Sequence, residues 1–267
     1  MALHRREYVQ GLQRGFAVIK TFSADAPALT IADLASRTGL TRAVARRYLF
    51  TLEELGCVAR NGATFTLTPR ILDLGFTYLS TIEVPKAAQP FMERLTQQLH
   101  ESCSVSVLDG SDCVYVARVS AKRIMSINLS VGSRLPAHAT SMGKVLLAHL
   151  DAERLAAYFA ASPLAPMTRR TICTEAALRR ALDGVRARGY AFADQESEDG
   201  VRTVAVPLFD RRHHVAAAMN VSCHASRVSM RELKSRFLPA LVDAAREISL
   251  ALGAHVERLY PPRARLA

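Results

Sequence analysis

The sequence predicts two domains: a small helical N-terminal domain that ends in a β-hairpin, and a larger α+β domain with a mostly antiparallel sheet. A length of 267 residues is enough for about two domains. Closely spaced helix caps indicate the first domain, and hairpins interspersed with helices indicate the second. The 49% of hydrophobic residues supplies both cores and excludes a wholly disordered chain.

The N-terminal domain, residues 8–68, begins with three predicted helices. Tyr8–Phe22 carries apolar residues at helical spacing. Thr30 opens a second, short helix with T-I-A-D, a capping-box-like start in which Asp replaces the usual Glu, and Gly39 ends it. Thr41 then caps a third helix, which extends to residue 55. A tight glycine turn therefore joins the second and third helices.

The third helix has an apolar face and a basic face. At 100° per residue, its apolar arc consists of Val44, Ala45, Tyr48, Leu49, Leu52 and Leu55. Arg42, Arg46 and Arg47 lie on the opposite arc, and no acidic residue occurs between Asp33 and Glu53. The electrostatic field at this helix is therefore positive.

Two short β-prone runs follow this helix and flank Asn61-Gly62, a strong hairpin signal. The order of paired helices, basic helix and hairpin is that of a winged helix-turn-helix, whose second paired helix enters the major groove of DNA. A helical hairpin with a solvated arginine face is the alternative for a lone basic helix. The net charge of +11 also suits an acidic partner, although the charge is spread along the chain.

We therefore expect double-stranded operator DNA as a partner. The expected contacts are Arg42, Arg46 and Arg47 in the major groove, Ala43 at a thymine methyl group, Arg37 and Thr41 on phosphates, and Arg60 and Asn61 on the backbone or minor groove. The sequence leaves open whether Arg46 reads a guanine or contacts a phosphate.

A linker helix is predicted over residues 69–84, stopped by Pro85, and the α+β domain over residues 85–255. In this domain we expect strands at 103–108, 113–119, 124–129, 201–209 and 215–221, and helices at 91–99, 141–150, 153–161, 174–188 and 230–252.

Several function classes have no support. The five cysteines include no C-x-x-C pair and fit a reducing cytoplasm. The N-terminus lacks the apolar core of a signal peptide, and no apolar run reaches the ~18 residues of a membrane span. Histidines without ligand spacing and glycines without a nucleotide motif give no reason to expect a metal or a cofactor. A soluble, cytoplasmic protein is expected.

Ser141-Met-Gly-Lys144 matches the S-x-x-K pattern of penicillin-recognising serine enzymes. No K-T-G or S-D-N accompanies it, so we expect no enzyme, and a serine hydrolase or transferase using Ser141 and Lys144 is the alternative. A helix N-terminus at Ser141 would instead suit the carboxylate of a small ligand. The acidic loop formed by Asp194, Glu196, Glu198 and Asp199 is expected to be solvated.

Two long segments resemble the IclR-type transcriptional regulators: V-G-S-R-L-P-A-H-A-T-S-M-G-K-V-L-L-A at 131–148 and D-Q-E-S-E-D-G-V-R-T-V-A-V-P-L-F-D at 194–210. The resemblance covers roughly residues 8–255, and these versions look most like regulators of aromatic-acid breakdown through protocatechuate and β-ketoadipate. It implies a GAF-like effector domain, a homodimer made through the DNA-binding domains, and often a dimer of dimers.

The resemblance also implies positions for a small organic acid effector. These are Ile124, Ile127 and Leu135 as apolar walls, Ser141 and Met142 at the helix N-terminus, and Thr203, Asn220 and Ser222 as polar contacts. Arg134 or His138 would hold the carboxylate, with a surface salt bridge as the alternative for Arg134. Ala193 stands where small-acid sensors of the family carry Asp, which favours a larger, aromatic or dicarboxylic acid. A DNA-tethered interaction module without a ligand is a further alternative.

Overall fold

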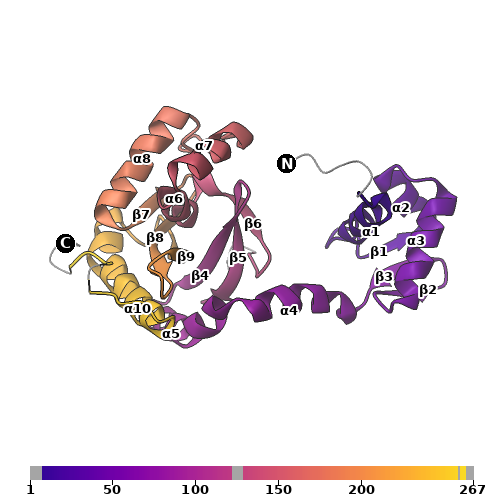
Figure 1. Cartoon of the computed structure of the whole chain (residues 1–267), viewed down its shortest axis with the longest axis horizontal. Coiled ribbons are helices and arrows are strands. Elements are labelled where there is room, and N and C mark those ends of the chain that lie inside the picture. The colour runs from indigo at the N-terminus through magenta and orange to yellow at the C-terminus, as the bar shows by residue number, and fades with distance from the viewer. Residues whose placement is uncertain (1–7, 122–128, 258, 263–267) are drawn as a thin grey trace. The chain divides into compact units, whose positions relative to one another are not determined.

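The computed structural model describes residues 8–121, 129–257 and 259–262. The chain divides into two compact units, Met1–Thr81 and Ile82–Ala267 (Figure 1). The elements of the first unit are α1 (Gln10–Lys20), β1 (Ala28–Thr30), α2 (Ile31–Thr38), α3 (Arg42–Glu54), β2 (Val58–Asn61), β3 (Thr64–Leu67), a 3-10 turn (Pro69–Ile71) and α4 (Leu72–Thr81).

The local signals of the first unit are confirmed. The Thr30 hydroxyl accepts a hydrogen bond from the backbone amide of Asp33 at 3.1 Å, and the Thr30 amide donates to the Asp33 carboxylate at 2.9 Å, which completes the capping box at α2. Gly39 follows α2 with φ 71°, a conformation that glycine adopts without steric cost. The Thr41 hydroxyl accepts from the amide of Val44 and caps α3.

The core of the first unit lies between the three helices and the hairpin. Leu34 of α2, Leu49 of α3 and Phe65 of β3 are almost fully buried. The sequence missed the short strand β1, which pairs antiparallel with β3. The placement of Leu55 on the apolar arc was wrong, because α3 ends at Glu54 and the Leu55 side chain is 56% exposed.

The helix after the hairpin differs from the predicted linker. α4 ends at Thr81, and Ile82 has extended backbone geometry before α5 (Glu83–Leu99) begins. Pro85 was expected to stop a helix but lies in the first turn of α5, where the missing N–H removes no intrahelical hydrogen bond. The predicted helix at 91–99 is therefore the second half of a longer one that also contains Pro90.

The second unit is an α+β domain built on a six-stranded antiparallel sheet, as predicted, with strand order β6-β5-β4-β9-β8-β7. After α5 its elements are β4 (Ser102–Asp109), β5 (Asp112–Val119), β6 (Arg134–Pro136), a 3-10 turn (Ala137–Ala139), α6 (Ser141–Ala148), α7 (Ala152–Ala161), α8 (Glu175–Arg188), β7 (Ala191–Asp194), β8 (Val201–Phe209), β9 (Val215–His224), α9 (Met230–Glu232), a π-helical segment (Leu233–Phe237) and α10 (Leu238–Ala251).

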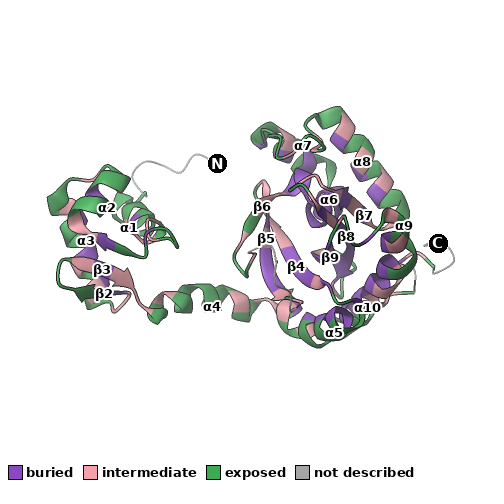
Figure 2. Ribbon diagram, turned by 180° about the vertical axis from the view of Figure 1, so that it is seen from behind, coloured by how far each residue is buried: buried purple, intermediate pink, exposed green. Residues whose placement is uncertain are grey.

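Helices cover both faces of this sheet. α6, α7 and α8 pack on one face, where Met142, Val145 and Leu182 join the buried cluster with Tyr115 and Ala218 of the strands. α5 and α10 pack on the other face, and much of the sheet consists of buried residues (Figure 2). We call the face under α6 the α6 face.

Two elements of the second unit departed from expectation, and a third lies mostly outside the described residues. The short edge strand β7 was missed. The predicted final helix is interrupted by the π-helical segment at Leu233–Phe237. The strand expected at 124–129 falls mostly outside the described residues, and the strand beside β5 is β6. Among the described residues, no helix is long and apolar enough to cross a membrane.

Candidate functional site

The residues predicted to contact DNA lie on the last turn of α2, on α3 and the turn before it, and on the β2–β3 hairpin of the first unit. Arg37, Thr41, Arg42, Ala43, Arg46, Arg47, Arg60 and Asn61 are all exposed. α3 is the second helix of a tight helix pair, as the sequence predicted. The hairpin turns at Gly62 and Ala63, one residue later than the predicted Asn61-Gly62 turn, because Asn61 still pairs with Thr64. The arrangement presents the basic arc of α3 and the tip of the hairpin to solvent, where a duplex can contact them.

In the second unit, the N-terminus of α6 lies against the sheet. The Ser141 hydroxyl and the Thr203 hydroxyl of β8 share a hydrogen bond at 2.7 Å, and both residues are buried. The Ser106 hydroxyl of β4 donates to the sulfur of Met142 at 3.3 Å. A Cβ at Gly143 would lie 2.0 Å from the Ala137 carbonyl oxygen, so only glycine allows α6 to pack this closely on the 3-10 turn.

A row of polar residues crosses the α6 face. Ser104 of β4 pairs directly with Arg118 of β5 on one side and with Asn220 of β9 on the other. Directly opposed residues in a sheet project from the same face, so the three side chains lie together. Arg118 is partly buried and its guanidinium donates to the Ser104 hydroxyl at 3.0 Å. Burial lowers the pKa of Arg118.

Asn220 belongs to the same row and is 4% exposed. Among the described residues, no hydrogen-bond donor reaches its side-chain oxygen. A buried amide oxygen without a donor costs free energy, and native structures rarely leave one so. This part of the α6 face is therefore suited to a ligand that carries a donor.

Sequence reasoning missed Ser104, Ser106 and Arg118. A usable signal was present, since Ser102, Ser104 and Ser106 alternate along β4 with the period of two that places side chains on one face. That face is covered by α6, and a covered face of hydroxyl groups departs from the usual apolar core.

Other predicted effector residues lie apart from the row. Arg134 is exposed and binds Asp109 at 2.8 Å and Asp112 at 3.1 Å, which matches the surface salt bridge considered as its alternative. The His138 ring lies 3.0 Å from the carbonyl oxygen of Ala165. Leu135 pairs with Cys113 and packs against the cluster under α6.

Ser222, the last of the predicted polar contacts, is half-buried and pairs with Thr203 across β8 and β9. Ile124 and Ile127 lie outside the described residues.

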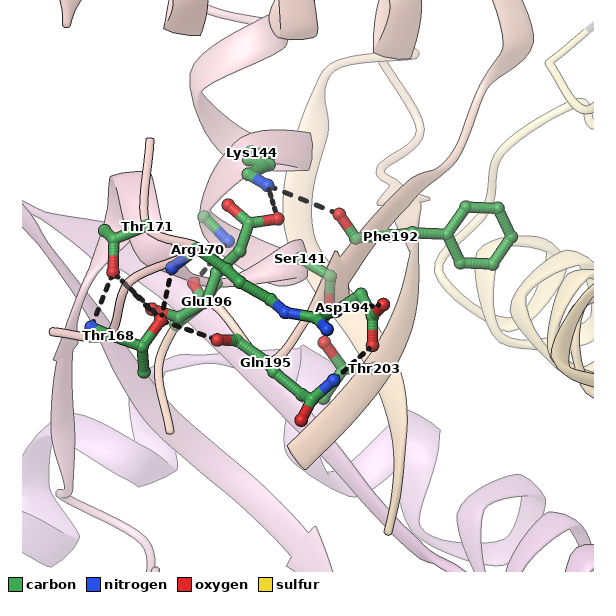
Figure 3. A network of polar contacts seen from close by, with 12 residues as sticks. Ser141, Lys144, Thr168, Arg170, Thr171, Phe192, Asp194, Gln195, Glu196 and Thr203 are labelled. Atoms are coloured by element: carbon green, nitrogen blue, oxygen red, sulfur yellow. Dashed lines mark hydrogen bonds and ion pairs between the residues drawn. The ribbon is translucent and has the colours of Figure 1, made fainter. Parts of the chain in front are cut away.

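One turn along α6 from Ser141, Lys144 forms a buried ion pair. Its ammonium group donates to the Glu196 carboxylate at 2.5 Å and to the Phe192 carbonyl at 3.4 Å (Figure 3). The Lys144 and Glu196 side chains are 4% and 12% exposed. Burial lowers the pKa of Lys144 and raises that of Glu196, while the attraction between the two charges opposes both shifts.

The acidic loop is therefore not simply solvated, which corrects the expectation. The Thr171 hydroxyl donates to the Glu196 carbonyl at 2.7 Å (Figure 3). Asp194 accepts from Arg202 at 2.8 Å and from Arg170 at 2.9 Å. The two remaining acidic residues of the loop, Glu198 and Asp199, are exposed as predicted.

Comparison with known sequences decides the family. The helix-turn-helix domain of IclR matches residues 11–62, and the C-terminal domain of the bacterial transcriptional regulator IclR matches residues 76–250. The chain belongs to the IclR family. α3 and the hairpin thus belong to the helix-turn-helix domain of an IclR-family protein, and the α6 face belongs to its C-terminal domain.

Relatives within the IclR family match over most of the chain. The Pca regulon regulatory protein of Pseudomonas putida is 42% identical over 91% of this chain and 84% of its own length. The p-hydroxybenzoate hydroxylase transcriptional activator of Acinetobacter baylyi is 36% identical over 92% of this chain and 93% of its own. A crystal structure of an IclR homolog from Microbacterium hydrocarbonoxydans, complexed with 4-hydroxybenzoate, is 27% identical, with a TM-score of 0.80 over 90% of this chain and 98% of that one.

The IclR assignment agrees with the geometry at Ser141. In a serine enzyme of the S-x-x-K type, the lysine lies close to the serine hydroxyl and assists its deprotonation. Here the Ser141 hydroxyl bonds to Thr203, whereas the Lys144 ammonium group bonds to Glu196. The Ser141 and Lys144 side chains thus have separate hydrogen-bond partners. Among the described residues, no cluster of His, Cys, Asp and Glu could hold a metal ion.

Proposed function

We propose that this IclR-family regulator responds to an aromatic acid bound on the α6 face of its C-terminal domain, and that the acid changes how a homodimer holds operator DNA. The observation that carries the acid site is the buried Asn220 oxygen without a donor, in the same row as the guanidinium of Arg118. A hydroxybenzoate offers a carboxylate for the cation and a phenol hydroxyl that donates to the amide oxygen.

The dimensions of the row support this class of acid. Arg118 and Asn220 lie on strands two places apart, and strands in a sheet are about 4.8 Å apart, so their Cα atoms are separated by roughly 10 Å. An aromatic ring with polar groups at opposite ends fits between two side chains at that separation. Met142 supplies apolar surface for the ring, and the first amide groups of α6 favour negative charge.

Two relatives support the same choice. One is the activator of p-hydroxybenzoate hydroxylase, and the other is an IclR homolog complexed with 4-hydroxybenzoate. The Pca regulatory protein of Pseudomonas putida is also consistent with control of genes for aromatic-acid breakdown. We assign the carboxylate to Arg118 rather than to Arg134, because Arg118 lies in the same row as Asn220 on the α6 face, whereas Arg134 is exposed at the β4–β5 turn.

The homodimer is supported by exposed apolar side chains on the helices of the first unit. Leu12 and Phe16 of α1 are 63% and 46% exposed, and Leu72 and Phe76 of α4 are 69% and 70% exposed. On each helix the two side chains are four residues apart and lie on one face, and exposed apolar patches of this kind mark sites of association. We assign these helices to contact with a second copy of the chain, and sedimentation of the wild type against a Phe16→Glu/Phe76→Glu variant tests the assignment. A wild type that sediments as a monomer contradicts it.

Isothermal titration calorimetry tests the acid site. The titrants are 4-hydroxybenzoate, protocatechuate, β-ketoadipate and glyoxylate, and the proteins are the wild type, Arg118→Gln, Asn220→Leu and the matched control Arg134→Gln. We expect an aromatic acid to bind the wild type and the control equally. Arg118→Gln should lose about 1.5 to 3 kcal/mol of binding free energy, the range for a hydrogen bond to a charged group.

If none of the four acids binds the wild type, the assignment of a sensor is wrong, and a DNA-tethered module without a ligand is favoured. Binding that Arg134→Gln abolishes and Arg118→Gln does not would relocate the carboxylate to the β4–β5 turn.

A further inference from the structure

A cleft of about 600 Å³ lies within the first unit, between α3 and the β2–β3 hairpin. The N-terminus of α2 closes one side of it, and the rings of Phe50 and Phe65 form its floor. Arg42 and Arg46 of α3 line one wall, and Arg60 of β2 lines the other. The cleft is thus apolar at its base and cationic along both edges.

Phe50 connects the two walls. The guanidinium carbon of Arg46 lies 4.7 Å from the centre of the Phe50 ring, and that of Arg60 lies 5.5 Å from it. Both distances are within the range of cation–π attraction. The Phe50 ring itself packs edge-on against buried Phe65, with ring centres 6.0 Å apart. One anchored ring therefore holds two guanidinium groups from different elements.

Further contacts orient these guanidinium groups. Arg46 and Phe50 are four residues apart on α3, so they lie on one face of the helix. The Nε atom of Arg60 donates to the carbonyl oxygen of Gly62 at the hairpin turn, at 3.1 Å. Orientation in advance lowers the conformational entropy that a long side chain loses on binding.

The charges on this cleft are not neutralised inside the described part of the protein. None of the ion pairs found there includes Arg42, Arg46 or Arg60. Two guanidinium groups that contact the same ring repel each other, and an anion bound to both reduces that repulsion. A phosphate fits the geometry, since guanidinium groups bind its oxygens with paired hydrogen bonds.

The position of the cleft suggests which phosphate. With α3 in the major groove and the hairpin tip on the neighbouring surface of the duplex, one sugar–phosphate strand has to pass between them. Arg47 follows Arg46 by about 100° around the helix and is not among the described residues that line the cleft. The Arg47 side chain is therefore not held in the cleft, and it can contact base edges in the major groove.

We propose that the cleft clamps one phosphate strand of the operator between Arg46 and Arg60, with Phe50 as the positioning residue for both. The proposal rests on the proposed DNA-binding role and gives Arg46 to phosphate rather than to guanine. Base reading on α3 is then carried by Arg47 and Ala43.

Binding titrations over a series of KCl concentrations test the clamp. Each protein is titrated with the operator fragment and with an unrelated fragment of equal length. Arg46→Ala and Phe50→Leu should weaken binding to both fragments by similar factors, about tenfold for Arg46→Ala, because hydrogen bonds to charged groups contribute on that scale. The slope of log affinity against log salt should fall by about 0.9 for each phosphate that the variant no longer neutralises.

Two variants serve as controls. Phe50→Tyr keeps an aromatic ring under both guanidinium groups and should restore the wild-type slope, which a merely space-filling role of Phe50 would not require. Arg47→Ala should lose affinity for the operator more than for the unrelated fragment. Circular dichroism and thermal midpoints identify any variant whose first unit has unfolded.

The possible outcomes distinguish failure of the phosphate clamp from failure of the DNA-binding role. A wild type that binds neither fragment would defeat the DNA-binding role itself. If the wild type binds, the clamp is overturned when Arg46→Ala loses only operator affinity with an unchanged salt slope. It is also overturned when folded Phe50→Leu and Phe50→Tyr both keep the wild-type slope.

Discussion

The cationic side chains of the two units differ in burial and in ion pairing. On α3 and the hairpin, arginines stand exposed, and no carboxylate within the described residues pairs with Arg42, Arg46 or Arg60. In the second unit, Lys144 is buried and its charge is met by Glu196. An exposed guanidinium keeps its hydration until a partner replaces the water, whereas a buried ammonium has to be compensated by the fold. Charge for recognition and charge for structure are thus distinguishable by burial and pairing.

The largest effect is expected where the buried pair is broken. Lys144→Ala removes one partner and leaves the Glu196 carboxylate buried without its cation. We expect the free energy of unfolding of the second unit to fall by about 3 to 5 kcal/mol. Urea denaturation followed by circular dichroism measures this loss.

A double variant sharpens that test. Lys144→Met/Glu196→Leu replaces both charges with apolar groups of similar size and should recover most of the stability, because such replacements are often neutral. If Lys144→Ala unfolds at the wild-type urea concentration, the pair is not structural and the contrast between the units fails.

An exposed cation gives the complementary result. Arg47→Ala should weaken operator binding by about 1 to 3 kcal/mol, the range for a base-reading arginine, and should shift unfolding by less than about 0.5 kcal/mol. Fluorescence anisotropy with labelled operator gives the first number, and urea denaturation gives the second. A stability loss equal to that of Lys144→Ala would show that the α3 arginines are structural.

Substitution of an uncharged helix-capping residue tests the stability of the first unit without changing its charge. Thr30→Ala removes the side-chain acceptor of the capping box at α2 and should cost about 0.5 to 2 kcal/mol of stability. Thr30 lines the cleft but carries no charge, and the variant keeps Arg42, Arg46 and Arg60, so the salt slope of DNA binding should stay at the wild-type value. A changed slope with an intact fold would mean that α2 itself contributes phosphate contacts.

The smallest effect is expected at Asp194, which is intermediate in burial. Its hydrogen bond with Arg202 lowers the pKa of the carboxyl group, and Arg170 acts in the same direction. A lowered pKa adds stability above the unfolded-state value near ~3.9, and this stability is lost as the pH falls through the folded-state value.

Asp194→Asn should therefore reduce the free energy of unfolding by less than about 1 kcal/mol at pH 7. Below pH ~3 the free energies of unfolding of the variant and the wild type should become more similar, because the wild-type carboxylate is then protonated. Unfolding curves at both pH values measure the effect. A difference that stays constant with pH would exclude the charge as its origin.

Local patterns explain why the first unit was predicted so fully. The capping box at Thr30, the glycine after α2 and Gly62 in the hairpin turn each act within a few residues, so the sequence displays them. The strand β1 was missed because three residues carry no period. Pro85 was misread because the same residue ends one helix or opens another, depending on which neighbouring segment packs.

The contacts of the second unit join residues far apart in sequence. Lys144 and Glu196 are separated by 52 positions, and Ser141 and Thr203 by 62. Only the strand order of the sheet brings them together, and periodicity does not give strand order. The same holds for Arg118 and Asn220, although the alternating serines of β4 did indicate a polar face. The family resemblance placed Asn220 in the site, while the register identified Arg118 as its neighbour in the row.

Exposed arginines of the first unit are proposed to bind duplex DNA, and an acid on the α6 face is proposed to change the affinity for that DNA. Titration of the DNA upstream of its own gene, across KCl concentrations and with and without 4-hydroxybenzoate, tests both proposals most directly. We predict affinity that falls linearly in log salt, and an acid-dependent change in affinity that is matched by an equal change in acid affinity on DNA. Absence of binding at moderate ionic strength, or affinity that does not respond to salt, would contradict the account.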